Sequence, residues 1–281
     1  YDIIFVVNAA NGPFGILTKL FNKKTVINVD GLEWLRPKWK GIGATYYKFA
    51  ARMATIFYDQ IVNDAEEMRK IYLELFGKDS KVIAYGPKEN TDKASKIHDK
   101  LKLKKLDYYL IVGRLIPDNN WDILVDGFKL SSSNKKLVIV GDNPFKNKFQ
   151  DNLTNTESGN IIFTGLIKDQ GELCDLFKNA YAYLHGHEYG GTNPTLIEAL
   201  SFGNAVLALN TVFNKEVLQN GKYGLFFEKT KESVRELIQY ADSNKKEILD
   251  LKEKSKNALK NKYEWNYIVD QYIEVFEKLN A

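Results

Sequence analysis

Short apolar segments rich in β-branched residues alternate along this chain with longer segments whose apolar positions recur with a helical period. In the first third, strands are predicted at residues 2–7, 25–29, 60–63 and 81–84, and helices at residues 44–58 and 65–76. Further on, strands are predicted at residues 108–112, 136–140, 160–163, 180–184, 205–208 and 224–227, and helices at residues 121–130, 173–179 and 194–202, before a helical C-terminal part. Strands that alternate with helices typically form parallel sheets covered on both faces.

A polar, lysine-rich segment separates the two series of elements. It covers residues 87–106, begins with Pro87 and has no apolar period, so it is predicted to be a linker. The predicted fold class is therefore α/β, with two Rossmann-like, doubly wound domains facing a cleft. The first domain is predicted at residues 1–86 and the second at residues 107–262. Residues 263–281 are predicted to form a final helix that packs back on the first domain.

The first predicted domain is short of strands. A doubly wound domain normally opens with a strand and a tight phosphate-type turn, whereas only about four strands are predicted here and none precedes Tyr1. The first domain is therefore expected to lack its opening strands, as if the chain started in mid-domain.

Composition narrows the class of partners. The chain has 281 residues, is 44% hydrophobic, and carries a formal net charge of +4, which is too small to indicate nucleic acid. No apolar run reaches the ~18 residues of a membrane-spanning helix. Cys174 is the one cysteine, which argues against a disulfide framework and favours the cytoplasm. The lysines between residues 245 and 262 are interpreted as a solvated helix face; the alternative is peripheral contact with an anionic membrane at its inner face.

The densest candidate chemistry lies in the loop that leaves the strand predicted at residues 180–184. Open α/β sheets bind ligands at the carboxyl ends of their strands. Gly190 and Gly191 free the backbone to approach a ligand closely, and Asn193 followed by Pro194 is a favourable helix start. The free N–H groups of the first helical turn favour a phosphate.

Glu198 lies one turn into the same predicted helix, among apolar residues. A carboxylate in such surroundings is costly unless it is paired, and a ribose could supply two hydroxyl donors to it. The alternative is an ordinary capped helix whose acid faces solvent.

Two other strand ends carry weaker signals. Arg114 follows Gly113 at a strand end and could hold a diphosphate through two hydrogen bonds; a structural ion pair is an equal alternative. Gly165, Leu166 and Ile167 follow another strand, where backbone groups could meet the edge of a nucleobase.

Together these residues resemble glycosyltransferase family 4, whose fold is of the GT-B type. That family carries a Gly-Arg after the first strand of its second domain, a Gly-Asp turn after the next strand, and a Glu-x7-Glu motif. The resemblance covers essentially the whole chain. It is closer to a rhamnosyltransferase-like branch, on the stretches Asn-Val-Asp-Gly-Leu-Glu-Trp (28–34), His-Gly-His (185–187) and Gly-Gly-Thr-Asn-Pro (190–194).

The sequence departs from the family pattern at two positions. The first glutamate of the motif would fall at Gly190, eight positions before Glu198, and Glu188 is offset from it by two. The family usually has a lysine five residues after the arginine of Gly-Arg, and this chain has Asn119. Less positive charge would then face a diphosphate. Both departures agree with the rhamnosyltransferase-like branch.

The resemblance implies a nucleotide-sugar donor, with dTDP-L-rhamnose as the first expectation, and a saccharide or lipid-linked saccharide acceptor in surface polysaccharide synthesis. It also implies retention of anomeric configuration, with neither a metal nor another cofactor, and the sequence has no Asp-x-Asp motif. The donor-binding residues that it implies are Arg114, Gly165, Leu166, Ile167, Gly190, Gly191, Thr192, Asn193, Thr195 and Glu198.

The loop at residues 30–40 is predicted to lie on the acceptor side. It follows a strand and mixes acids, bases and two tryptophans, whose faces commonly pack against sugar rings. The acceptor-side residues predicted there are Glu33, Trp34, Arg36 and Trp39. The predicted catalytic residues are Asp30, Glu188 and His187. The alternative is a surface loop whose tryptophans anchor it to the core.

Two further functions fit the same residues. A sugar-nucleotide epimerase of the same fold would share the nucleotide site but need no acceptor, so product analysis distinguishes it. A truncated or degenerate module would bind nucleotide sugar or a partner without turnover, and the start at Tyr1 predicts poor turnover by this chain alone. A dinucleotide-dependent oxidoreductase is disfavoured, because no Gly-x-Gly-x-x-Gly opens a βαβ unit.

Overall fold

The computed structural model describes residues 2–88, 95–142 and 159–281, and divides the chain into two compact units. Unit 1 comprises Tyr1–Gly86, Tyr189–Asn193 and Asn261–Ala281. Unit 2 comprises Pro87–Glu188 and Pro194–Lys260. Tyr1 and parts of the segments predicted as linker and second domain (89–94 and 143–158) lie outside the described residues. Each unit contains one sheet, and both sheets are parallel throughout, as the alternation of strands and helices predicts.

Unit 1 has a four-stranded sheet in the order β1-β2-β3-β4. Its strands are β1 (Ile3–Val7), β2 (Lys24–Asn28), β3 (Gln60–Asn63) and β4 (Lys81–Val82). Its helices are α1 (Gly15–Leu20), α2 (Ile42–Phe57), α3 (Glu66–Phe76) and α12 (Trp265–Asn280), with 3-10 turns η1 (Ala9–Phe14) and η2 (Glu33–Leu35). The four strands lie where the apolar pattern predicts them. Helix α1 was not predicted, because six residues are too few to show a helical period.

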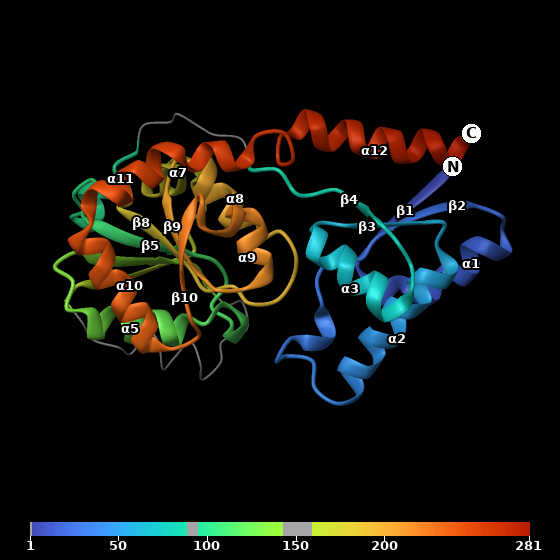
Figure 1. The fold of residues 1–281 in the computed structure, drawn as a ribbon, viewed down its shortest axis with the longest axis horizontal. Coiled ribbons are helices and arrows are strands. Elements are labelled where there is room, and N and C mark those ends of the chain that lie inside the picture. The colour runs from blue at the N-terminus through green and yellow to red at the C-terminus, as the bar shows by residue number, and fades with distance from the viewer. Residues whose placement is uncertain (1, 89–94, 143–158) are drawn as a thin grey trace. The chain divides into compact units, whose positions relative to one another are not determined.

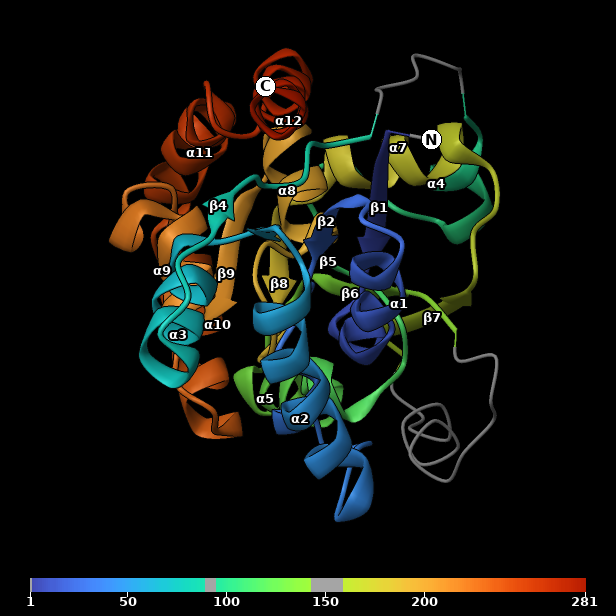
Figure 2. The same ribbon diagram turned by 90° about the vertical axis from the view of Figure 1, so that its right-hand side faces the viewer.

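Helix α12 covers one face of the unit 1 sheet, and α2 and α3 lie on the other side (Figure 1). Ile268 and Val275 of α12 are buried against Val26, Val62 and Ile83 of the sheet region. Helix α2 packs along η1 and α1 (Figure 2). Strand β2 ends at Asn28 and β3 at Asn63, so the loops that follow these two residues leave the carboxyl end of the sheet.

Unit 2 has a six-stranded sheet in the order β10-β9-β8-β5-β6-β7. Its strands are β5 (Tyr108–Val112), β6 (Lys136–Val140), β7 (Ile161–Gly165), β8 (Ala182–His185), β9 (Ala205–Leu209) and β10 (Gly224–Phe227). Its helices are α4 (Ile97–Leu101), α5 (Trp121–Ser131), α7 (Gln170–Asn179), α8 (Pro194–Ser201), α9 (Val212–Val217), α10 (Lys231–Ser243) and α11 (Lys245–Lys254), with 3-10 turns η3 (Pro117–Asn119), η4 (Gln219–Gly221) and η5 (Ser255–Leu259).

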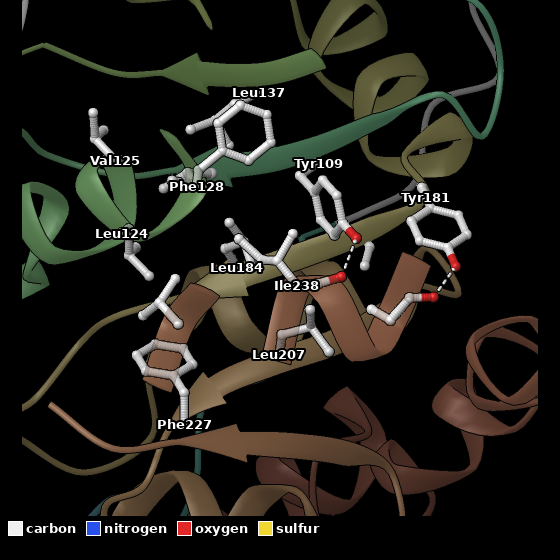
Figure 3. Packing of buried hydrophobic residues seen from close by; sticks show 14 of the residues in the cluster. Tyr109, Leu124, Val125, Phe128, Leu137, Tyr181, Leu184, Leu207, Phe227 and Ile238 are labelled. Atoms are coloured by element: carbon white, nitrogen blue, oxygen red, sulfur yellow. Dashed lines mark hydrogen bonds between the residues drawn. The ribbon is translucent and has the colours of Figure 1, made fainter. Parts of the chain in front are cut away.

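Helices α5 and α10 lie against one face of this sheet and α7 and α8 against the other (Figure 1). Figure 3 shows the core under α5 and α10, where tyrosine hydroxyls are satisfied inside the apolar layer. The Tyr109 hydroxyl lies 2.8 Å from Oδ1 of Asp242 and 3.4 Å from the carbonyl oxygen of Ile238, and Tyr181 donates to the carbonyl oxygen of Ala241 at 2.6 Å. Buried hydroxyls need such partners, so these bonds fix α10 against the sheet.

The order of strands in unit 2 reverses between β5 and β8. Strand β5 pairs with β6 on one side and with β8 on the other, so the connections from these neighbouring strands depart in opposite directions. Open α/β sheets bind ligands at such a switch point, outside the carboxyl ends of the strands. No helix among the described residues combines the length and apolar character needed to cross a bilayer.

Candidate functional site

Two loops that are separate in the sequence meet at the switch point of unit 2. The loop after β5 contains η3, and the loop after β8 begins at Gly186. The side-chain amide of Asn120 donates to the carbonyl oxygen of Gly186 at 2.8 Å. A Cβ atom on Gly186 would lie 2.3 Å from the carbonyl oxygen of Asn119, so glycine is required for this close approach.

Asn119 joins the same two loops through its side chain. Its amide group donates to the carbonyl oxygen of Arg114 at 2.8 Å, so its other atom, Oδ1, is an acceptor. The Nδ1 atom of His187 lies 2.8 Å from that oxygen and donates to it. Asn119 stands where the family pattern has a lysine, and here it holds His187 in position.

Arg114 is exposed at the start of the loop after β5. Within the residues that the structure describes, its guanidinium forms no ion pair. The alternative interpretation, a structural ion pair of Arg114, therefore lacks an acidic partner among these residues. A charged planar group at a switch point is suited to hold an anion through two hydrogen bonds.

Glu188 is already paired with a cation. Lys229, two residues beyond β10, lies 2.5 Å from its Oε2 atom, and Asn120 donates to the same carboxylate at 3.4 Å. Glu188 was predicted to be catalytic; in this structure its carboxylate links the loop after β8 to the segment after β10.

His185, the last residue of β8, is buried beside His187, with ring centroids 6.2 Å apart. Burial, followed by the charge of His187, lowers the pKa of His185 to about 3. The imidazole is therefore neutral near pH 7. Its Nε2 atom has no hydrogen-bond partner among the described residues, and a buried polar atom of this kind calls for a ligand group or water.

Glu198 is buried in the first turns of α8, between Ile197 and Ala199, which are fully buried. Its carboxylate does not face bulk water, because the side chain is only 6% exposed. Lys88 reaches it, with 3.1 Å between the lysine Nζ and Oε1 of Glu198. The side chain of Lys88 is 67% exposed, so a buried acid is balanced by a cation that stands largely in solvent.

Thr195 lies at the start of α8, and its hydroxyl is hydrogen-bonded to Tyr183. Burial raises the pKa of Tyr183, and its hydroxyl in turn donates to the carbonyl oxygen of Val112 at 3.1 Å. These bonds tie the first turn of α8 to the carboxyl end of β5. Arg114, Thr195 and Glu198 therefore all belong to the switch-point side of unit 2.

The residues predicted to flank a nucleobase lie at the end of β7, which is separated from β8 by the two strands β5 and β6. Gly165 has a φ of 68°, a left-handed conformation that favours glycine, and its carbonyl oxygen accepts from the Gly141 N–H at 3.0 Å. Leu166 is 63% exposed and Ile167 is partly buried. An exposed apolar residue beside a strand end leaves a surface on which a planar base could pack.

The glycine-rich stretch Gly190, Gly191, Thr192 and Asn193 belongs to unit 1, where it contacts Asp64. The Thr192 N–H donates to Oδ2 of Asp64 at 3.0 Å, and its hydroxyl donates to the Asp64 carbonyl oxygen at 2.6 Å. A Cβ atom on Gly191 would lie 1.8 Å from Oδ1 of Asp64. Gly191 thus makes room for a carboxylate of the protein itself. The sequence had explained this glycine only by close approach to a ligand.

Glu33 is the centre of a closed cluster in the loop after β2. Its carboxylate accepts from the Arg36 guanidinium at 2.5 Å and from the Trp39 indole N–H at 2.8 Å, and Lys38 lies 3.0 Å away. Burial alone would raise the pKa of Glu33, but the hydrogen bond and charge of Arg36, with Trp39 and Lys38, hold it below its ordinary value. Burial and the negative charge of Glu33 instead raise the pKa of Asp30.

The two tryptophans of this loop pack against the protein. Trp34 has its ring centroid 6.2 Å from that of Tyr72 and 6.3 Å from that of Phe76 on α3. Trp39 lies 4.8 Å from Tyr47 on α2. This is the arrangement of the alternative interpretation, in which the tryptophans anchor the loop, and their acceptor-side role stays a prediction.

Three residues with clear roles were missed at the sequence level: Asp64, Lys88 and Lys229. Asp64 directly follows the strand predicted at residues 60–63, and Asp30 and Arg114 also lie just after predicted strands. The position of Asp64 at a strand end could therefore have indicated a functional role. Lys88 and Lys229 carried none, because each is one of many lysines and its partner is far away in the sequence.

The family described as "Glycosyl transferases group 1" matches residues 92–265, more than half of the chain. A domain of unknown function, DUF1972, matches residues 2–88. An uncharacterized glycosyltransferase of Methanocaldococcus jannaschii is 26% identical over 286 aligned positions, which cover 94% of this chain and 71% of that protein.

Solved structures share the fold at low identity. Sucrose-phosphate synthase from Thermosynechococcus elongatus has a TM-score of 0.83 at 16% identity, over 100% of this chain and 74% of that one. HepE of Anabaena, in complex with UDP, has a TM-score of 0.79 at 17% identity, over 100% of this chain and 79% of that one. These similarities confirm the predicted GT-B fold class, with two parallel sheets, of which the first has four strands.

Proposed function

We propose that unit 2 binds a nucleotide-diphosphate sugar, because this chain belongs to the family of glycosyl transferases group 1. The glycosyl group is proposed to be transferred to a saccharide acceptor with retention of configuration and without a metal. The family match supports glycosyl transfer from a nucleotide sugar. The residues, the sugar and the acceptor are the parts that we propose.

The observation that carries the proposal is the burial of Glu198 at the switch point. A carboxylate that is 6% exposed needs hydrogen-bond donors, and among the described residues its ion-pair partner is one mostly exposed lysine. A nucleoside would supply hydroxyl donors at the place where α/β sheets bind nucleotides. Glu198 is therefore proposed to bind the sugar of the nucleoside.

The diphosphate is proposed to lie at the start of α8, near Thr195 and within reach of Arg114. Helix starts offer free N–H groups and partial positive charge, and the exposed guanidinium adds a bidentate donor. Gly165, Leu166 and Ile167 are proposed to flank the nucleobase. Gly190–Asn193 were predicted to join this cradle, and their contribution stays a proposal because they belong to unit 1.

Cleavage of the anomeric bond places negative charge on the leaving diphosphate and positive charge on the sugar ring. Fixed donors such as Arg114 are proposed to stabilise that negative charge as it develops. His187, held by Asn119, and neutral His185 are proposed to hydrogen-bond the transferred sugar. Glu188, fixed by Lys229, is proposed to face the positive charge of the ring.

The acceptor is proposed to bind unit 1 at the loop after β2. Asp30, whose pKa is raised by burial and by Glu33, is suited to take a proton from an acceptor hydroxyl. Glu33, Trp34, Arg36 and Trp39 hold the shape of this loop. The acceptor class remains a saccharide or lipid-linked saccharide, in surface polysaccharide synthesis at the cytoplasmic face of a membrane.

The identity of the donor sugar rests on the resemblance, which favours dTDP-L-rhamnose. The HepE structures contain UDP or UDP-glucose, so a uridine donor is the second candidate. The two differ at the nucleoside: uridine presents two ribose hydroxyls to Glu198, whereas deoxythymidine presents one.

The test is a panel of nucleotide sugars with thermal unfolding as the first readout, because a bound ligand raises the unfolding temperature by mass action. The expected result is stabilisation by dTDP-rhamnose or UDP-glucose, followed by release of nucleoside diphosphate when saccharide acceptors are added. Absence of binding to every nucleotide sugar would contradict the proposal. Binding without release would favour the module without turnover, and a changed sugar without an acceptor would favour the epimerase.

A further inference from the structure

We propose that Lys88 is a second cation of the donor site, which releases Glu198 to the sugar of the nucleoside and turns to the diphosphate. The inference rests on the proposed function. It begins from the ion pair that Glu198 forms among the described residues, in which the Nζ atom of Lys88 lies 3.1 Å from Oε1.

The pair is asymmetric in a way that favours exchange. The Glu198 side chain is 6% exposed and lies on helix α8, whereas the Lys88 side chain is 67% exposed on the segment without regular secondary structure that follows β4. A pair with one partner in solvent is worth little, so hydroxyl donors can replace the lysine at small cost. Glu198 would keep its compensation throughout, first from the ammonium group and then from the nucleoside.

The released ammonium group would have the diphosphate within reach. Thr195 marks the start of α8, three residues before Glu198, and a helix rises about 1.5 Å per residue, so the two positions differ by about 4.5 Å along the axis. The four-carbon stem of Lys88 spans such a distance by changes in its side-chain torsions alone. No movement of the sheet or of α8 is needed.

Among the described residues, few cations at this end of unit 2 are available to neutralise a bound diphosphate. The position five residues after Arg114 is Asn119, whose amide is engaged with the Arg114 carbonyl oxygen and with His187. Lys229 is engaged with Glu188. A diphosphate brings at least two negative charges, and Lys88 can add its positive charge to that of Arg114 without breaking any other contact that the structure describes.

The experiment compares Lys88→Met with Lys88→Arg and with Lys129→Met as the matched control. Lys129 is an exposed lysine on α5 that lies 3.9 Å from Asp126, so its removal tests the loss of one surface charge alone. Titration calorimetry would measure the Kd of each variant of the 281-residue chain for a nucleoside and for its diphosphate, using uridine with UDP and thymidine with dTDP.

The expected result is selective. Lys88→Met should raise the Kd for the nucleoside diphosphate by about tenfold and leave the Kd for the nucleoside unchanged or lower, while Lys88→Arg stays within about threefold of the wild type. An equal change for both ligands, in either direction, or no change for the diphosphate, would overturn the role of Lys88. A wild-type chain that binds neither diphosphate would instead refute the proposed function, so the two failures are distinguishable.

Discussion

Replacement of Glu198 by glutamine tests the central residue of the proposed donor site. Glutamine keeps the shape of the side chain and one acceptor oxygen but removes the negative charge. Hydrogen bonds to a charged group contribute about 1.5–3 kcal/mol each. The nucleoside should therefore bind Glu198→Gln more weakly by about 1.5–3 kcal/mol, which is roughly a 10- to 150-fold increase in Kd.

The same substitution should change folding stability little. Its partner Lys88 is 67% exposed and would become fully hydrated, and an ion pair of this kind contributes up to about 1 kcal/mol. Removing a buried charge also relieves its desolvation. The unfolding temperature should thus move by only a few degrees, about 2–4 °C per kcal/mol for a chain of this size class.

Calorimetry with nucleosides and thermal unfolding of the same samples separate binding from folding. Glu236→Gln is the control, because Glu236 is exposed and pairs with the neighbouring Arg235. A uridine donor predicts a larger loss for uridine than for thymidine, since only ribose offers two hydroxyls. Unchanged nucleoside affinity would remove Glu198 from the site, and a large parallel loss of stability would give it a structural role instead.

Three other predictions follow from the local geometry. Arg114→Ala should raise the Kd for nucleoside diphosphates by about tenfold and leave nucleoside binding unchanged in calorimetry; equal effects would contradict a diphosphate role. Gly191→Ala should lower the free energy of unfolding by roughly 1–3 kcal/mol in urea, because the new Cβ would lie 1.8 Å from Asp64, whereas Gly159→Ala, with open space around it, should have little effect. Glu33 has a pKa below its ordinary value despite burial, because Arg36 pairs with it. The stability that it contributes is complete above the ordinary pKa and is lost as the pH falls through the lowered one, so Glu33→Gln should flatten the dependence of unfolding free energy on acid pH; an unchanged acid profile would refute this.

The alternation of strands and helices was predictable because hydrophobic periodicity is a local property. Strand β5 and helix α5 lie within a residue or so of their predicted positions. Helices α4 and α9 were missed, since five or six residues complete too little of a helical period to be recognised. Helix α4 lies inside the segment that the polar composition marked as a linker.

The sequence predicted which strand ends carry the candidate site residues, but it did not predict which of those residues contact one another. The loops containing Arg114 and His187 could be placed at carboxyl ends from the apolar runs before them. That they touch through Asn119 depends on the pairing of β5 with β8, which no local pattern encodes. For the same reason Trp34 could be read as a sugar platform, although its ring packs against α3.

The sequence by itself determined the parallel α/β class, the strand ends where ligands can bind, and the resemblance that carries glycosyl transfer. These follow from residues that are neighbours along the chain. Only the tertiary structure decided which charged and polar groups meet: Glu198 with Lys88, Glu188 with Lys229, and Thr192 with Asp64. Those pairs join positions 41 to 128 residues apart, and their distances depend on strand order and burial rather than on any periodicity.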